Sequence, residues 1–300
     1  MQSCFYKSAD GIDLHALYWR CDNPSSESCV LLLHGFTNDA HVWDEIAAEL
    51  SREHHVLAPD FRGHGDSAWD PKARYSHWQL VEDIGEIAQQ FQFPRWHVVG
   101  HSLGARVAML AIADGLLAAQ SFVVIDAAPE VSAEASAKIL NDALSTPQQF
   151  ESYEAYDSHL KRLYVLASDE AINRLGLFGL RKRDKRFYTK MDPAFTPNLW
   201  HQSPELQEQE RIRGPLVEKL WESLGKVKAP VLLLRGQASA VLTQAMAESL
   251  IESTLHDGQL RTVSRSGHAL MIDNPTECSD YINQFLAAQS QTKHSIRRAS

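Results

Sequence analysis

The chain has 300 residues, of which 44% are hydrophobic, so it is long enough for one large α/β domain or for such a domain with an insertion. Its formal net charge of −9 at pH 7 and its isoelectric point of about 5.8 argue against a nucleic-acid partner. No apolar run approaches the ~20 residues that a membrane-spanning helix needs, so we expect no membrane span.

The cysteines and the N-terminal residues indicate a reducing compartment. The four cysteines, at positions 4, 21, 29 and 278, form no Cys-x-x-Cys pair and no spacing typical of a metal site. Residues 1–7 lack the apolar core of a signal peptide. We therefore predict reduced thiols, no bound metal and a cytoplasmic location.

Strand and helix patterns alternate through the first 128 residues. Residues 5–20 indicate a hairpin with a two-residue turn at Asp10-Gly11. Strands alternating with helices give a parallel sheet that is covered on both faces. The predicted strands are residues 29–33, 55–58, 96–99 and 121–125, and the predicted helices lie around residues 43–50 and 80–91.

This alternation stops after about Pro129. Residues 129–213 are helical in pattern and charged, and we predict a helical cap inserted over the C-terminal edge of the sheet, where open α/β sheets bind ligands. The basic run at residues 181–186 is interpreted as a solvated loop or helix face. The segment is rich in aromatic residues: Phe150, Tyr153, Tyr156, Tyr164, Phe178, Phe187, Tyr188, Phe195 and Trp200.

The pattern of the sheet resumes at residue 214. Strands are predicted at residues 231–235 and 259–263, and a helix around residues 276–288. The predicted organisation is a core formed by residues 1–128 and 214–288, with the cap at 129–213 between its two parts. Residues 289–300 are polar and basic, and we expect a disordered tail there.

The most informative motif is the pentapeptide Gly-His-Ser-Leu-Gly at residues 100–104. The β-branched run 96–99 precedes it, and the helix formers of residues 105–111 follow it. A strand that turns sharply into a helix through two glycines leaves the central serine on a strained, exposed corner. The helix N-terminus also directs backbone N–H groups at an oxyanion formed on a substrate. We therefore interpret Ser102 as a nucleophile.

Three further motifs accompany this pentapeptide. They are His-Gly-Phe at residues 34–36, Pro-Asp-Phe-Arg-Gly-His-Gly-Asp-Ser at residues 59–67 and Ser-Gly-His at residues 266–268. With them, nearly the whole chain resembles the α/β-hydrolase superfamily. The resemblance implies a mostly parallel, doubly wound sheet with an inserted cap.

The resemblance also implies roles for individual residues. Ser102 matches the nucleophile and His268 the general base, while the backbone N–H groups of Phe36 and Leu103 match the oxyanion hole. Some small acid-substrate lyases of the fold place an arginine in the stretch that contains Arg106, on the helix after the serine, but a surface or packing role is expected here. Structural rather than chemical roles are also expected for His34, His101, Arg62, His64 and Asp66.

The carboxylate that orients the base is missing from its usual place. Relatives with an Arg-Gly-x-x-Ser segment carry an aspartate where this chain has Ala240, and no carboxylate follows before Glu248, which should lie in a helix. Three explanations remain open: the acid has moved to Asp126, after the strand that follows the nucleophile helix; the enzyme works with a Ser–His dyad; or the protein binds a ligand without catalysis. An engineered alanine at position 240 would give the same sequence.

These residues predict a cofactor-independent serine hydrolase. A serine nucleophile with a histidine base and two oxyanion donors suits acyl transfer from an ester, thioester or lactone to water. Dehalogenases and epoxide hydrolases of the superfamily use an aspartate in place of Ser102, so neither activity is expected. The aromatic cap favours a small apolar or aromatic substrate and a carboxylesterase. The alternatives are a carbon–carbon bond hydrolase or lyase of the same fold and a catalytically impaired ligand-binding protein.

Overall fold

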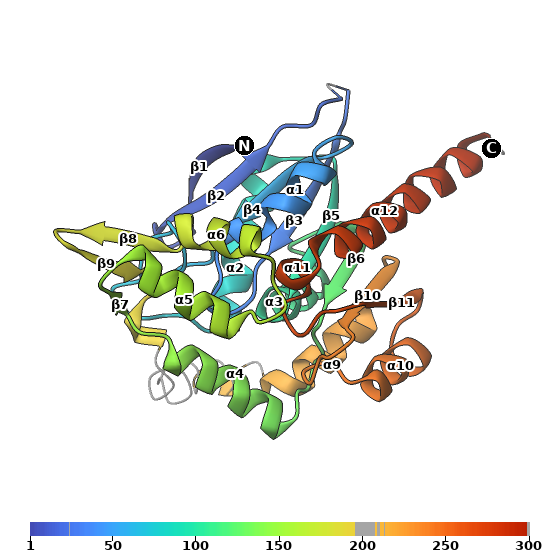
Figure 1. The fold of residues 1–300 in the computed structure, drawn as a ribbon. Coiled ribbons are helices and arrows are strands. Elements are labelled where there is room, and N and C mark those ends of the chain that lie inside the picture. The colour runs from blue at the N-terminus through green and yellow to red at the C-terminus, as the bar shows by residue number, and fades with distance from the viewer. Residues whose placement is uncertain (24, 196–207, 209–210, 213, 299–300) are drawn as a thin grey trace.

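The computed structural model describes residues 1–300 except 24, 196–207, 209–210, 213 and 299–300, and it describes residues 290–298 by their backbone only. An eight-stranded sheet in the order β1-β2-β4-β3-β5-β6-β10-β11 forms the centre (Figure 1). β2 pairs antiparallel with β1 and β4, and all other neighbours are parallel, which confirms the predicted sheet. The strands are β1 (Gln2–Lys7), β2 (Asp13–Trp19), β3 (Ser28–Leu33), β4 (His55–Pro59), β5 (Arg95–His101), β6 (Ala119–Ile125), β10 (Val231–Gly236) and β11 (Gly258–Val263).

Helices cover both faces of this sheet. Successive side chains of a strand point to opposite faces, and in β3 Leu31 and Leu33 join one buried cluster while Val30 and Leu32 join the other. α2, α3, α9 and α10 pack on the first face, and α1, α11 and α12 on the second. These helices are α1 (Asp44–Leu50, after the 3-10 turn Ala40–Trp43), α2 (His77–Phe91), α3 (Leu103–Ala113), α9 (Leu216–Lys226), α10 (Gln244–Ser253), α11 (Leu270–Asp273) and α12 (Pro275–Arg298).

The N-terminal hairpin forms, but its predicted two-residue turn is wrong. The connection between β1 and β2 is the five-residue loop 8–12, closed by hydrogen bonds from Ser8 N to the Ile12 carbonyl and from Gly11 N to the Ser8 carbonyl. Gly11 has a φ of +84°, which glycine adopts without strain. Asp10 accepts a hydrogen bond from the Ser8 hydroxyl and pairs with Arg62, so its side chain serves the tertiary structure.

The segment between β6 and β10 combines helices with a second, small sheet. Three strands in the order β7-β9-β8 pair antiparallel, and β8 and β9 form a hairpin that projects from the molecule (Figure 1). The basic run at residues 181–186 lies in this hairpin, so its interpretation as a loop or helix face is wrong. The elements are α4 (Ala133–Ser145), β7 (Gln149–Phe150), α5 (Tyr153–Leu163), α6 (Asp169–Phe178), β8 (Leu180–Arg183), β9 (Arg186–Thr189) and the 3-10 turn Pro193–Phe195.

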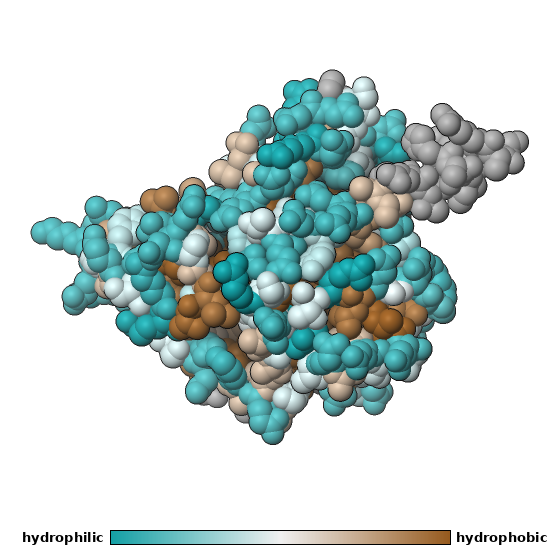
Figure 2. Space-filling view, turned by 45° about the vertical axis from the view of Figure 1, so that its right-hand side comes forward, coloured by the Kyte–Doolittle hydropathy of each residue, from teal (hydrophilic) through white to brown (hydrophobic). Residues whose placement is uncertain are grey.

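The C-terminal segment also differs from its prediction. α12 begins at Pro275 and continues to Arg298, so helical backbone occupies most of the stretch 289–300 where we expected a disordered tail. Among the described residues, no helix combines the length and the hydropathy needed to cross a membrane. On the face drawn in Figure 2, apolar residues gather in separate patches between hydrophilic ones.

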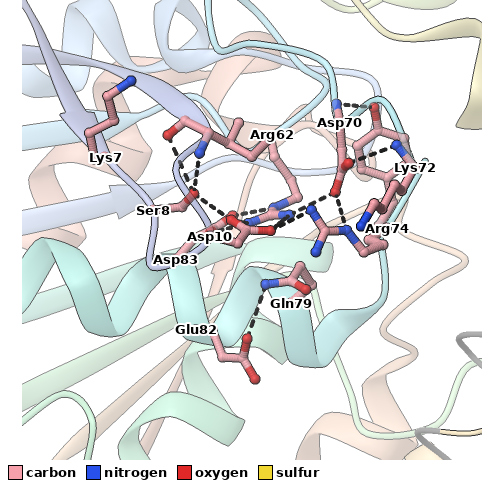
Figure 3. Close-up of polar contacts among 12 residues, drawn as sticks. Lys7, Ser8, Asp10, Arg62, Asp70, Lys72, Arg74, Gln79, Glu82 and Asp83 are labelled. Atoms are coloured by element: carbon pink, nitrogen blue, oxygen red, sulfur yellow. Dashed lines mark hydrogen bonds and ion pairs between the residues drawn. The ribbon is translucent and has the colours of Figure 1, made fainter.

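Arg62 anchors the loop after β4. Its guanidinium, which is fully buried, forms ion pairs with Asp70 and Asp83, also buried, and with Asp10 (Figure 3). The hydrogen bonds to Asp83 and Asp10 raise the pKa of Arg62 above its ordinary value. Arg74 pairs with Asp10 and Asp70 from the outer side. These contacts agree with the predicted scaffold role of Arg62.

Replacement of this arginine is expected to destabilise the fold. Arg62→Met should lower the free energy of unfolding by about 3–5 kcal/mol at pH 7.5, because buried carboxylates lose their partner. Burial already raises the pKa of Asp83 to about 6, and loss of Arg62 raises it further. A group whose pKa is higher in the folded than in the unfolded state stabilises the fold increasingly as the pH falls. The loss of unfolding free energy in Arg62→Met should therefore be smaller at pH 5.5 than at pH 7.5. Urea unfolding at pH 7.5 and pH 5.5 measures the two free-energy losses, with Arg95→Met, at an exposed arginine, as the control. Equal losses at the two pH values would contradict the prediction.

Candidate active site

Ser102 stands on the turn between β5 and α3. Its φ is +49° and its ψ is −112°, a strained conformation for a residue with a side chain. A Cβ on Gly104 would lie 2.3 Å from the Leu33 carbonyl oxygen, and one on Gly100 would lie 2.6 Å from the Ala105 Cα. Both glycines are therefore required by close backbone approach, and the tight turn leaves Ser102 partly exposed at the end of β5.

His268 and Asp126 lie together, although 142 positions separate them in the sequence. His268 follows β11 and Asp126 follows β6, and the Nδ1 of His268 lies 2.8 Å from the Asp126 Oδ2. The carboxylate is fully buried, whereas the His268 side chain is 28% exposed. Donation from Nδ1 to the carboxylate leaves Nε2 of the neutral ring as an acceptor. Nε2 is then the atom that can take a proton from a nucleophile.

Two further donors, one at the end of β10 and one in the loop after it, also bond to the Asp126 carboxylate. The Gly236 N–H donates to Oδ1 at 3.0 Å, and the Ser239 hydroxyl donates to Oδ2 at 2.5 Å. Ser239 in turn accepts from the N–H groups of Val241 and Leu242, which fixes its hydroxyl. Ser239, the last residue of the Arg-Gly-x-x-Ser segment, was not predicted as a site residue from the sequence. Its contact depends on the pairing of β6 with β10, which no local pattern reveals.

Ala240 lies on the wall of the cavity that contains Ser102 and His268. The methyl group at this position offers no hydrogen bond to His268. Glu248 lies within α10, as predicted. Another carboxylate on the wall of this cavity, Asp273, accepts a hydrogen bond from the Gly267 N–H, and burial raises its pKa. Among the described residues, Asp126 is the carboxylate that contacts the His268 ring.

His101 links the serine turn to the histidine loop. Its Nε2 lies 2.9 Å from the His268 carbonyl oxygen, and the two rings have centroids 4.6 Å apart. Burial holds the pKa of His101 well below its usual value, so the ring is neutral and donates from Nε2. The structural role predicted for His101 agrees with this contact, although its hydrogen bond to the His268 backbone has no local signal in the sequence.

The loop that follows β3 is fixed by His34. Its Nδ1 bonds to the Gly35 carbonyl and its Nε2 accepts from the Phe61 N–H, and burial lowers its pKa. Phe36 and Ser102 line both cavities described below, and Leu103 joins them in the second cavity. The two backbones expected to form an oxyanion hole therefore both lie beside Ser102.

Two cavities meet at Ser102. The first, of about 320 Å³, contains His268 and is bounded by Thr37, Asn38, Tyr164 and Ala240. The second, of about 290 Å³, extends along α3 and α4 and contains Leu103, Arg106, Ile139 and Leu140. Both volumes suit small organic molecules.

The aromatic residues between β6 and β10 mostly pack among themselves or against the core. Phe150 and Tyr156 belong to a separate buried cluster, Phe178 stacks on His41, and Phe195 stacks on Tyr75. Among the described aromatic residues of this segment, Tyr164 is the one that lines a cavity with Ser102, and Trp200 lies outside the described residues. The aromatic residues of this segment therefore contribute little to the two cavity walls, and the apolar residues of those walls are mostly aliphatic.

A histidine and two aspartates form the one group of possible metal ligands within the described part of the chain: His15, Asp60 and Asp66. Asp60 already accepts hydrogen bonds from His15 Nδ1 and from the Ala40 and Asp66 N–H groups. His15 bonds to Ser3 through its other nitrogen. Since these hydrogen bonds already engage the ligand atoms, we interpret the group as part of the scaffold.

Comparison with known proteins assigns the chain to a family. The family model of the alpha/beta hydrolase family matches residues 30–281, so this chain belongs to that family. The fold is also that of a solved E-2-(acetamidomethylene)succinate hydrolase, with a TM-score of 0.80 and 24% identity over 95% of this chain and 100% of that one.

Two curated relatives are similar over most of their length. A 2-(acetamidomethylene)succinate hydrolase of Mesorhizobium japonicum is 27% identical over 78% of this chain and 79% of its own. Esterase Rv0045c of Mycobacterium tuberculosis is 26% identical over 91% of this chain and 86% of its own. Both relatives are hydrolases, which supports hydrolase activity for this chain.

Proposed function

We propose that this protein is a serine hydrolase that cleaves a carboxylic ester, or a thioester or lactone, through an acyl-enzyme on Ser102. The observation that carries the proposal is the hydrogen bond between His268 Nδ1 and Asp126, which leaves Nε2 available beside the cavity that contains Ser102. The esterase named among the relatives supports an ester as the substrate class. The proposed reaction requires no cofactor. We also propose that residues 129–213 form the cap and that the protein is located in the cytoplasm.

In the proposed mechanism, His268 removes the proton from the Ser102 hydroxyl as the oxygen attacks the carbonyl carbon of the substrate. The N–H groups of Phe36 and Leu103 stabilise the tetrahedral oxyanion. The imidazolium then protonates the leaving group, and the acyl group stays on Ser102. Water, activated by His268, repeats the sequence and releases the acid. Asp126 keeps the imidazole in the reactive tautomer and stabilises its charged form.

The test is covalent labelling at neutral pH. A fluorophosphonate should add one equivalent to the protein, and peptide mapping should find it on Ser102. A panel of 4-nitrophenyl esters should be hydrolysed by the same preparation, since both reactions need an activated serine. A folded protein that neither reacts with the probe nor hydrolyses any ester would contradict the proposal and favour a ligand-binding protein.

A carboxylate restored at position 240 is expected to add little. In Ala240→Asp, kcat/KM for an ester should change by less than about threefold, because the Nδ1 of His268 already bonds to Asp126. Steady-state kinetics measures this, with Ala240→Asn as a control of similar size. A gain of tenfold or more for the aspartate alone would show that position 240 is the better acid site and would contradict the role proposed for Asp126.

A further inference from the structure

The second cavity contains a half-buried cation that the proposed mechanism does not use. Arg106 lies on α3, one helical turn after Ser102, and its side chain lines the cavity of about 290 Å³ that both residues share. Its Nε is buried and has no hydrogen-bond partner among the described residues. The surface or packing role expected from the sequence does not account for an unpaired donor on a cavity wall.

Within the described part of the chain, Arg106 has no carboxylate partner. One of its terminal nitrogens donates to the Pro129 carbonyl at 3.2 Å, and no carboxylate of the described residues forms an ion pair with the guanidinium. Burial lowers the pKa of Arg106 to about 10, so the group still carries its charge at neutral pH. His77 shares the cavity, and burial lowers its pKa to about 3, which keeps that ring neutral.

Of the described residues that line this cavity, Asp126 is the acidic one, and its oxygens are engaged by other groups. They accept from His268, Ser239 and Gly236. The rest of the wall is predominantly apolar, with Val131, Ile139, Leu140, Leu216 and others. A buried polar donor is normally satisfied, and a charged one without a partner is costly. A ligand that brings an anion to Arg106 would remove this cost.

The position of His268 decides which part of a substrate faces Arg106. His268 must protonate the leaving group, so the leaving group belongs in the first cavity, which His268 lines. The acyl group then extends from Ser102 into the second cavity, towards Arg106. We propose that the acyl group of the substrate carries a carboxylate at its far end, and that Arg106 binds it. This inference rests on the proposed serine hydrolase function.

Two esters with the same leaving group and six-carbon acyl chains test the inference. Mono-4-nitrophenyl adipate ends in a carboxylate, and 4-nitrophenyl hexanoate ends in a methyl group. The wild-type enzyme should show a kcat/KM at least about tenfold higher for the adipate ester, because hydrogen bonds to charged groups are among the stronger ones. Ser102→Ala supplies the background rate for each ester. A wild type that prefers the hexanoate ester would overturn the inference.

Arg106 variants locate the source of the preference. Arg106→Met should lose it, with at least a tenfold lower kcat/KM for the adipate ester and less than a threefold change for the hexanoate ester. Arg106→Lys should retain part of it, since it keeps the charge but not the planar donor set. Equal losses for both esters in Arg106→Met would overturn the inference. If Arg106→Met fails to fold, the wild-type preference and Arg106→Lys decide.

Lys138 supplies the matched control, because it is a cation on the wall of the first cavity and pairs with Asp142. Lys138→Met should keep the wild-type ratio between the two esters, and loss of the ratio would place the anion site in the first cavity instead. Hydrolysis of the hexanoate ester without preference for adipate would reject the role of Arg106 but leave the proposed function intact. Failure with both esters and with the fluorophosphonate would reject both.

Discussion

Ser102→Ala is expected to remove the ester hydrolase activity almost completely, with kcat/KM lowered by about 10⁴-fold or more. The serine oxygen is the atom that forms the acyl-enzyme in the proposed mechanism, and alanine offers no substitute. Alanine keeps the Cβ and therefore the same backbone constraint at φ +49°, so the free energy of unfolding should change little. Initial rates with 4-nitrophenyl hexanoate and intact mass after fluorophosphonate treatment measure both parts of the prediction.

Ser136 is the matched control for this experiment. It is an exposed serine that lines the second cavity but lies on α4 rather than on the turn. Ser136→Ala should be labelled like the wild type and should keep kcat/KM within about threefold, since surface substitutions are usually mild. A Ser102→Ala protein that retained a tenth of the activity, or that was still labelled, would require another nucleophile.

Local patterns were sufficient for most of the sheet and for two residues of the site. Strands β3 and β10 are covered on both faces, so their apolar runs identified them without tertiary information. Ser102 and His268 stand in short motifs whose glycines and neighbours carry a local signal. At Gly100 and Gly104, neighbouring backbone atoms lie so close that a Cβ would clash with them. The glycines that this close approach requires can be recognised in the sequence without knowledge of the fold.

Other features depend on contacts between distant segments and left no such signal. In the β8–β9 hairpin, three basic residues follow Leu180 in β8 and two adjacent aromatic residues stand in β9, so neither strand shows an apolar alternation. The turn uses Asp184 at a φ of +55°. Ser239 meets Asp126 only because β6 and β10 pair in one particular register. Arg106 has an ordinary helical context, and its unpaired nitrogen becomes apparent only when the cavity wall is assembled.

Asp126→Asn is expected to lower kcat/KM by about 10³–10⁴-fold, provided that Asp126 takes the role of the acid. The amide has one oxygen in place of two, whereas Gly236 N–H, Ser239 O–H and His268 Nδ1 all face the carboxylate. Whichever way the amide of Asp126→Asn is turned, its NH₂ group therefore faces a donor, because donors lie at both oxygen positions of the carboxylate. Turned towards His268, it would favour the tautomer with the proton on Nε2, which cannot accept a proton from Ser102. Turned towards Gly236, it would leave that N–H unsatisfied at a cost of about 1–3 kcal/mol in stability.

Two readouts separate the chemical effect from a structural one. Thermal unfolding reports the stability loss, while the rate of fluorophosphonate labelling by folded protein reports activation of Ser102. If labelling slows as much as hydrolysis while the protein remains folded at the assay temperature, the loss of kcat/KM is assigned to the His268 tautomer. Asp273→Asn is the matched control, because Asp273 also lies near His268 but bonds to Gly267 N; it should lose less than about tenfold. Asp126→Asn with wild-type kinetics would contradict the moved acid and leave a Ser102–His268 dyad as the catalytic unit.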